Sequence, residues 1–168
     1  MPFCPIFSPL IKECQSIIGY TFKSGVLCAQ ALNADSIVIT HLTDPVQFMP
    51  KNDRLAVYGD SAASLYLCGL WIEKGLAKNC WSTLRCELLS NENLSRVCKE
   101  HGLDKCINMN GGTTRVSSGM AATAVEAILG ATEMDGGRNA LATVMVRLGL
   151  TKHALISSVT IYLSLPRL

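Results

Sequence analysis

The feature that most constrains the fold is a single long stretch, from Asp53 to about Lys74, that is compatible with one uninterrupted helix. It ends before Gly75, a residue type that is common just after helices. A second apolar stretch, Gly119–Met134, also predicts a helix and ends at Asp135-Gly136-Gly137. Aromatic residues make up only 6% of the chain, so a core has to be built from Leu, Ile, Val, Ala, Met and Cys, a mixture typical of packed helices. The sequence therefore predicts an all-α fold.

Shorter segments extend this helical pattern along the chain. Apolar residues recur at helical spacing from Leu10 to Ile18. Further helices are expected at Ser24–Leu32, Trp81–Leu89, Glu92–Glu100 and Asn139–Leu148. Two connections remain: residues 33–52, with a short strand or turn at 36–42, and the loop 107–118.

The chain of 168 residues has the length of one domain. Pro2, Pro5 and Pro9 predict an extended N-terminal segment over residues 1–9. Residues 10–150 are expected to form the helical domain. Residues 151–168 form a C-terminal tail whose structure the sequence does not define.

Composition excludes several classes of protein. Hydrophobic residues make up 49% of the chain and charged residues 17%, which rules out intrinsic disorder and a highly charged coiled coil. The net charge of +2 gives no argument for a nucleic-acid binder from bulk charge. An RNA-binding face would have to be a local concentration of charge.

The eight cysteines show no zinc pattern, because no pair is spaced C-x-x-C and no histidine stands in ligand register with them. The N-terminal residues lack the features of a secretory signal. We therefore interpret the cysteines as small buried hydrophobes in a reducing intracellular compartment, with a disulfide scaffold as the alternative. Cytoplasm, nucleus and mitochondrion are not distinguished. No apolar run reaches the roughly 18–20 residues that span a bilayer, so no membrane association is expected.

Two predicted helices carry acids on apolar backgrounds. Asp53 and Asp60 are seven residues apart and share a helix face, and Glu126 is the only charge between Arg115 and Glu133. In one interpretation, Asp53 caps its helix, Asp60 forms an ion pair and Glu126 faces solvent. In the other, Asp60 and Glu126 converge across a helix–helix contact and bind Mg²⁺. Histidine-based triads and phosphate-binding glycine loops find no support in the sequence.

Four ordered motifs resemble the ribonuclease III domain family. The run Asn52–Ser61 resembles the signature helix of that family, which reads approximately N-E-R-L-E-F-L-G-D-S. The other three motifs agree in the same order: Ile18–Phe22 followed by Ala31-Leu32, Leu89–Leu94 followed by Gly102-Leu103, and Val125–Ala131 followed by Asp135–Gly137. Together they cover about residues 10–150.

This resemblance implies a ribonuclease III-type helical endonuclease domain that dimerises through its signature helix. The family's dimer forms a valley for double-stranded RNA, with Mg²⁺-dependent phosphodiester hydrolysis at each end. Position by position, the resemblance implies that Asp60 and Glu126 are catalytic and bind the metal, for which Mn²⁺ is an alternative. Asp53 and Asn91 would support RNA binding.

The sequence departs from the family pattern at two of its acids, which fall on Ala56 and Thr123. The signature Phe, which packs across the dimer, falls on Val57. Because the affinity of hard cations depends on ligand charge, we expect weakened Mg²⁺ binding.

Three functions remain open. The first is a double-stranded-RNA endoribonuclease, a homodimer with a reduced metal site. The second is a catalytically inactive RNA-binding or structural relative, for example a component of the mitochondrial-ribosome type. The third is a partner-binding module that keeps only the fold. Retention of both Asp60 and Glu126 favours the first, whereas Ala56 and Thr123 favour the other two.

Overall fold

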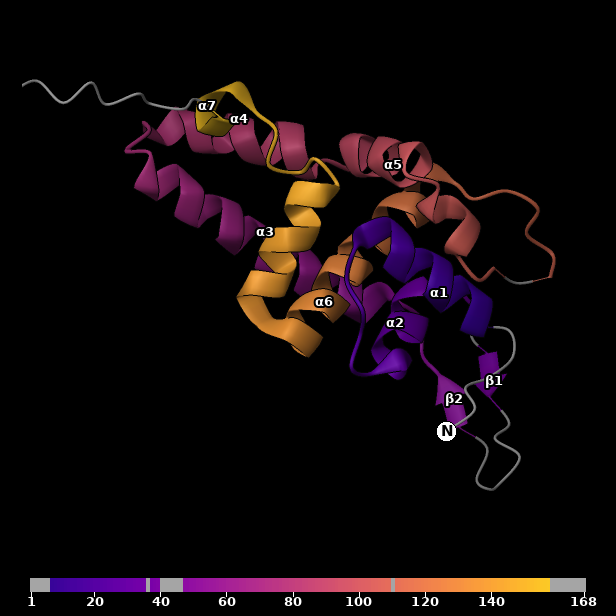
Figure 1. Cartoon of the computed structure of the whole chain (residues 1–168). Coiled ribbons are helices and arrows are strands. Elements are labelled where there is room, and N and C mark those ends of the chain that lie inside the picture. Colours follow the sequence, from indigo (N-terminus) through magenta and orange to yellow (C-terminus); the bar gives the residue numbers. More distant parts are fainter. Residues whose placement is uncertain (1–6, 36, 40–46, 110, 158–168) are drawn as a thin grey trace, which may run out of the picture.

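A computed structural model describes residues 7–35, 37–39, 47–109 and 111–157. The described part is mostly helical (Figure 1). In chain order the elements are α1 (Phe7–Ile18), α2 (Gly25–Leu32), β1 (Ile37–Ile39), β2 (Gln47–Met49), α3 (Asp53–Glu73), α4 (Lys78–Leu89), α5 (Asn91–Glu100), the 3₁₀-helix η1 (Leu103–Cys106), α6 (Ser118–Arg147) and α7 (Ala154–Ser157). The predicted all-α class is confirmed, with one two-stranded antiparallel sheet added to it.

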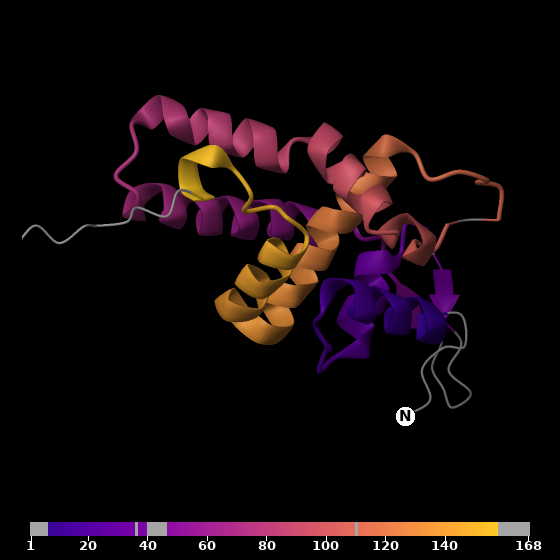
Figure 2. The same cartoon turned by 45° about the horizontal axis from the view of Figure 1, so that its top comes forward.

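The N-terminal half of α6 is the central helix of the domain. From Ala121 to Thr132 every residue is buried except Thr123 and Glu126. A helix that is apolar on nearly all sides has to be surrounded by other elements, and α6 packs against α2, α3, α5 and η1. Its most extensive contact is with α3, and α4 runs antiparallel beside α3 (Figure 2). The first half of α6 thereby places Thr123 and Glu126 beside α3.

The Asp135-Gly136-Gly137 motif joins the N-terminal helices to α6. The Asp135 carboxylate accepts hydrogen bonds from the Tyr20 hydroxyl (2.7 Å) and from the backbone N–H groups of Lys23 (2.8 Å) and Ser24 (2.9 Å). Gly137 has φ of 72°, in the left-handed region that favours glycine, and α6 kinks there. The backbone at Gly137 is not helical, so α6 consists of two helices that meet at this kink, as the sequence predicts.

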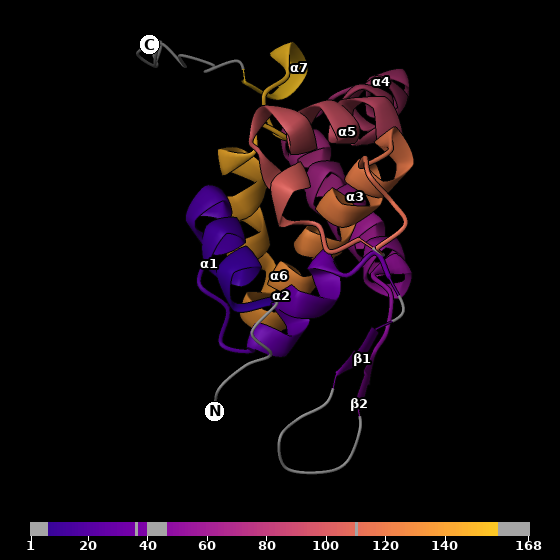
Figure 3. The same cartoon turned by 90° about the vertical axis from the view of Figure 1, so that its right-hand side faces the viewer.

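Asparagine side chains attach the β1–β2 connection to the helical body. The Asn33 side chain is fully buried and donates to the carbonyl oxygens of Asp35, Met49 and Pro50. It also accepts a hydrogen bond from Asn108 Nδ2 at 2.9 Å. β1 pairs with β2 in the predicted connection, away from the α3–α6 contact (Figure 3), so the strand expected within 36–42 is present.

Two element boundaries differ from the sequence-based expectation, and one helix lies in the tail that the sequence does not define. α1 begins at Phe7, so residues 7–9 are not extended: Pro9 lies in the first turn, where a missing N–H breaks no helical hydrogen bond. The rest of that predicted segment lies outside the described residues. α4 begins at Lys78 instead of Trp81, with Ala77 as N-cap. In the predicted tail, α7 forms and residues 158–168 lie outside the described part.

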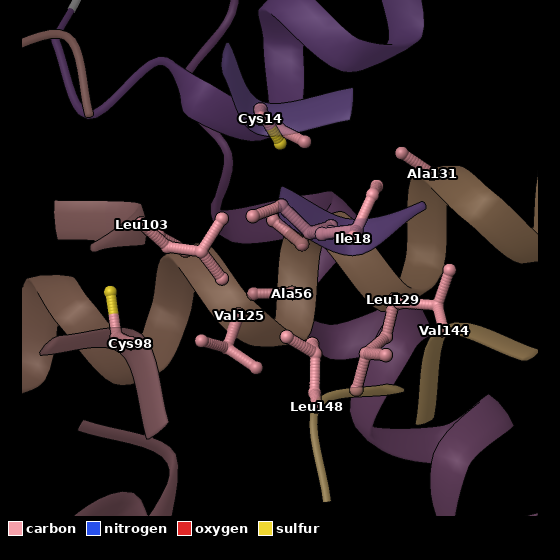
Figure 4. Packing of buried hydrophobic residues seen from close by; sticks show 14 of the residues in the cluster. Cys14, Ile18, Ala56, Cys98, Leu103, Val125, Leu129, Ala131, Val144 and Leu148 are labelled. Carbon is pink, nitrogen blue, oxygen red and sulfur yellow. The ribbon is translucent and has the colours of Figure 1, made fainter. Parts of the chain in front are cut away.

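The core consists mainly of aliphatic side chains and small residues, with Phe7 and Phe22 as its aromatic members (Figure 4). Of the seven cysteines that the structure describes, four are buried and all are free thiols. Burial raises the pKa of the Cys98 and Cys106 thiols to about 12, which keeps them protonated and unreactive. These cysteines therefore act as small hydrophobes, whereas Cys68 and Cys80 are partly exposed and Cys86 is exposed.

Among the described helices, α3 alone is long and apolar enough to cross a membrane by length and composition. One such helix is weak evidence for a membrane protein, because core helices of soluble proteins pass the same test. Here α3 carries Asp53, Asp60 and Glu73 and packs along α6.

Candidate active site at the α3–α6 crossing

Two glycines set the distance between α3 and α6. A Cβ atom added to Gly59 would lie 1.8 Å from the Glu126 carbonyl oxygen and 2.7 Å from the Gly130 nitrogen. A Cβ atom added to Gly130 would lie 2.4 Å from the Leu55 carbonyl oxygen. The two backbones therefore touch, with Gly59 against Glu126 and Gly130 against Leu55.

A hollow of about 410 Å³ opens at this crossing. It is lined by Asp53, Ala56, Val57, Asp60, Ser61, Thr123 and Glu126. Three of these residues are acids, and they reach the hollow from both helices. The two exposed positions in the central part of α6, Thr123 and Glu126, both line it. The structure thus brings Asp60 and Glu126 together, as the second interpretation of the sequence expected.

Asp60 is also paired with a base. Arg85 Nη2, from α4, lies 2.8 Å from Asp60 Oδ2 and 3.1 Å from Oδ1. One guanidinium nitrogen therefore contacts both carboxylate oxygens. The side chains of Arg85 and Asp60 are 45% and 32% exposed, so water partly screens the pair. The ion-pair interpretation of Asp60 thus holds alongside convergence with Glu126.

Glu126 has an unusual protonation equilibrium for a carboxyl group. Burial, and next the negative charge of Asp60, raise its pKa to about 7, although Arg85 acts in the opposite direction. Glu126 is neither fully exposed nor paired with a base by any described ion pair. A carboxyl group that titrates near neutral pH in a hollow is a common feature of functional sites.

The hollow provides few ligands for a metal ion. Within the described residues, no group of three or more His, Cys, Asp or Glu side chains is arranged to hold one. Mg²⁺ needs only one or two carboxylates when water fills the remaining positions, so the Asp60–Glu126 pair fits a weakly bound hydrated ion. Ala56 contributes a buried methyl group to the hollow and Thr123 a hydroxyl group.

The other two predicted site residues lie differently. Asp53 is the first residue of α3 and lines the hollow, where its Oδ1 atom accepts from the Arg54 N–H at 2.8 Å. The helix N-cap is Asn52, so the expectation that Asp53 caps the helix is wrong by one position. Asn91, the first residue of α5, lines a separate groove of about 590 Å³ with Arg96 and Lys99.

Sequence reasoning missed Arg85 as a member of the site. In the sequence it is one of several bases interleaved with acids, and it lies 25 positions after Asp60. The only available signal was its position on a helix that follows the signature helix, and that signal does not specify a partner.

An exposed apolar face runs along α3 next to the hollow. Val57 is 71% exposed, and Leu65 and Ile72 are each 65% exposed. On the same helix, the Tyr58 hydroxyl donates to Glu133 Oε2 at 2.6 Å, beside a pocket of about 260 Å³. Large exposed apolar side chains on one helix indicate a surface that another molecule covers.

The fold and site define a helical domain in which two carboxylates meet at a close crossing beside an exposed apolar helix face. The model of the ribonuclease III domain matches residues 53–137. The chain belongs to the ribonuclease III domain family.

Bacterial relatives named Ribonuclease 3 agree with this assignment. The protein of Rhodopirellula baltica is 29% identical over 138 residues, which are 76% of this chain and 47% of the relative. That of Idiomarina loihiensis is 28% identical over 146 residues, 82% of this chain and 58% of the relative. That of Caldanaerobacter subterraneus is 30% identical over 139 residues, 78% and 58% respectively. The chain thus spans about half the length of these relatives.

A solved structure of the nuclease domain of ribonuclease III from Campylobacter jejuni has a similar fold. It superposes with a TM-score of 0.65 at 25% identity, covering 82% of this chain and 94% of that domain. That structure is described as showing flexibility in a region involved in dimer formation. The predicted family and helical fold are both confirmed.

Proposed function

We propose that this chain is a homodimeric, metal-dependent endoribonuclease that hydrolyses phosphodiester bonds of double-stranded RNA with a reduced acidic site. The observation that carries the proposal is the convergence of Asp60 and Glu126 on one hollow at the α3–α6 crossing. Burial and the negative charge of Asp60 raise the pKa of Glu126 to about 7, and carboxyl groups perturbed in this way cluster at functional sites. The relatives named Ribonuclease 3 support the reaction class.

In this proposal Asp60 and Glu126 would bind Mg²⁺ or Mn²⁺, which supplies an activated water and neutralises charge on the phosphate. Asp53, at the edge of the same hollow, would orient the RNA strand and surrounding water. The Thr123 hydroxyl would hydrogen-bond water in the hollow, since it has no carboxylate to offer. With two carboxylates on the ion, affinity should be weak.

Dimerisation would cover the apolar face of α3. Val57, Leu65 and Ile72 would become buried against a second copy, as the family resemblance implies for the signature helix. A valley between two copies would recognise the A-form shape and 2′-hydroxyls of RNA. Because phosphate contacts release counterions, RNA affinity should fall steeply with salt. An intracellular, reducing location stays part of the proposal.

A second candidate function, non-catalytic binding of double-stranded RNA, is favoured by a specific observation. Arg85 occupies both oxygens of Asp60, and Ala56 and Thr123 provide no carboxylates. A site with fewer carboxylates, one of them already paired with an arginine, can contact RNA without hydrolysing it.

Cleavage of a long double-stranded RNA at low salt, first with Mg²⁺ and then with Mn²⁺, distinguishes these functions. Asp60→Asn and Glu126→Gln serve as site variants. Glu73→Gln, an exposed acid at the end of α3, is the control that removes the same charge elsewhere on that helix. Cleavage that both site variants abolish and the control retains supports the endoribonuclease.

Two other results change the conclusion. RNA retarded on a gel but uncut in both metals supports the binding protein. A chain that neither cuts nor binds RNA overturns both functions and leaves the partner-binding module. Sedimentation at micromolar concentration tests the dimer independently, and a monomer there contradicts the valley.

A further inference from the structure

Arg85 is a positively charged side chain that interacts with both Asp60 and Glu126. It contacts both oxygens of Asp60 through one nitrogen, at 2.8 and 3.1 Å. Its charge also favours the ionised form of Glu126, so it acts electrostatically on both members of the pair. α4 supplies this residue because it packs antiparallel along α3 (Figure 2).

The contact between Arg85 and Asp60 has a large effect on the charge of the hollow because few acids line it. With Ala56 and Thr123 in place of carboxylates, Asp60 and Glu126 are the acids at the centre of the crossing. The positive charge of Arg85 therefore offsets part of the negative charge that would attract a divalent cation. A cation that binds Asp60 through the same oxygens has to displace the guanidinium.

We propose that Arg85 is the internal counter-cation of Asp60 and competes directly with a divalent metal ion for that carboxylate. The inference rests on the proposed function in one respect, namely that Asp60 is a metal ligand. Arg85 is then a positioning residue, which fixes Asp60 in the metal-free protein and sets the metal concentration at which the site fills.

The size of the effect follows from two contributions. An ion pair that is about 40% exposed contributes modestly, equivalent to roughly a twofold to fivefold change in an equilibrium constant. Removing the guanidinium also removes the repulsion between a single and a double positive charge a few ångströms apart in a largely aqueous setting. Together they predict that Arg85→Gln tightens Mn²⁺ binding by about threefold to tenfold.

Titration calorimetry of the full chain with Mn²⁺, without RNA, measures this affinity directly. The variants are Arg85→Gln and Arg85→Lys, with Arg96→Gln as the matched control. Arg96 is also a partly exposed arginine in an ion pair, with Glu100 on α5, so its replacement removes the same charge outside the site. Circular dichroism verifies that each variant is folded.

Tighter binding in Arg85→Gln, with Arg85→Lys and Arg96→Gln close to the unsubstituted chain, supports the proposal. Addition of Asp60→Asn to Arg85→Gln should then abolish the gain. Equal affinity in all the chains overturns the competition and leaves the metal site intact. A gain in Arg96→Gln equal to that in Arg85→Gln also overturns it, because bulk charge then explains the effect.

The same titration separates failure of the inference from failure of the proposed function. If Arg85→Gln binds Mn²⁺ and the unsubstituted chain does not at millimolar concentration, competition is supported and the metal-dependent enzyme is contradicted. If neither chain binds, Asp60 is no metal ligand even when released, and both proposals are overturned.

Discussion

Substitution of Gly59 by alanine should separate the two helices that form the site. The added Cβ would lie 1.8 Å from the Glu126 carbonyl oxygen, where ordinary contact requires about 3.4 Å. The obstacle is backbone, so no side-chain rotation can remove it. The helices would have to move apart by roughly 1.6 Å, or α3 would have to rotate about its axis.

The expected loss of stability can be bounded from these contacts. Overpacking in a core typically costs about 1–3 kcal/mol, and a backbone obstacle belongs at the upper end. Alanine returns about 1 kcal/mol through its higher helix propensity. A net loss of about 2 kcal/mol should lower the melting temperature by roughly 4–8 °C in a domain of this size. Urea denaturation followed by circular dichroism measures it.

Gly119→Ala is the matched control for this substitution. Gly119 lies in the first turn of α6, and a Cβ there would meet only Ser117 Oγ at 3.9 Å. This variant should be as stable as the unsubstituted chain or slightly more so. The reasoning is refuted if Gly59→Ala is as stable as Gly119→Ala, because the helices then do not touch at Gly59.

Three further substitutions test the candidate site and the hydrogen bonds of Asp135. Asp135→Asn should cost about 1–2 kcal/mol at pH 7. Although burial acts in the opposite direction, hydrogen bonds from the Tyr20 hydroxyl and from backbone N–H groups lower the pKa of Asp135 in the folded protein. The stability that Asp135 contributes is therefore present above the unfolded pKa near 4 and is lost on acidification. A loss of stability in Asp135→Asn that stays the same from pH 7 to pH 2 contradicts this. Glu126→Gln should stabilise the chain above pH 7, on the order of 1 kcal/mol after allowance for solvent. The reason is that a pKa raised to about 7 makes the stability of the unsubstituted chain fall as pH rises from 4.5 through 7. Parallel curves of stability against pH for the two chains would count against it. Ala56→Glu combined with Thr123→Asp should lower the stability of the chain without metal. Mg²⁺ at one hundred times its Kd should then raise the free energy of unfolding of this variant by about 2.7 kcal/mol. A melting temperature that Mg²⁺ does not change would show that the site is lost for another reason.

Local patterns in the sequence were sufficient to predict most of the helices. Gly75 follows α3 with φ of 61°, as its residue type indicates. Ser24 stands at the N-cap of α2, where its side chain makes no capping hydrogen bond. Periodicity did not locate every helix boundary. Lys78–Cys80 lack an apolar pattern, so periodicity predicts a later start for α4 than the structure has. Gly136-Gly137, by contrast, correctly marks the end of one helix, because the backbone at Gly137 is not helical and α6 kinks there.

The site could be predicted only in part because its geometry depends on contacts between distant residues. Asp60 and Glu126 stood out as acids on apolar helices, and that pattern is local. Arg85 did not stand out, because its importance comes from α4 packing along α3. The closeness of Gly59 to Gly130 is likewise a property of two helices together, and neither glycine reveals it alone.

The close crossing also explains why a reduced set of acids can be stable. Each carboxylate added at a contact this tight raises the cost of ionising its neighbours, as the effect of Asp60 on the pKa of Glu126 shows. Four acids there would need a bound cation to offset their repulsion. With Ala56 and Thr123 in place of two acids and Arg85 against Asp60, part of the negative charge is offset within the chain itself. If the hollow binds a metal ion as proposed, this arrangement should increase stability without the ion and lower the affinity for it, and substitution of Arg85 separates these two effects experimentally.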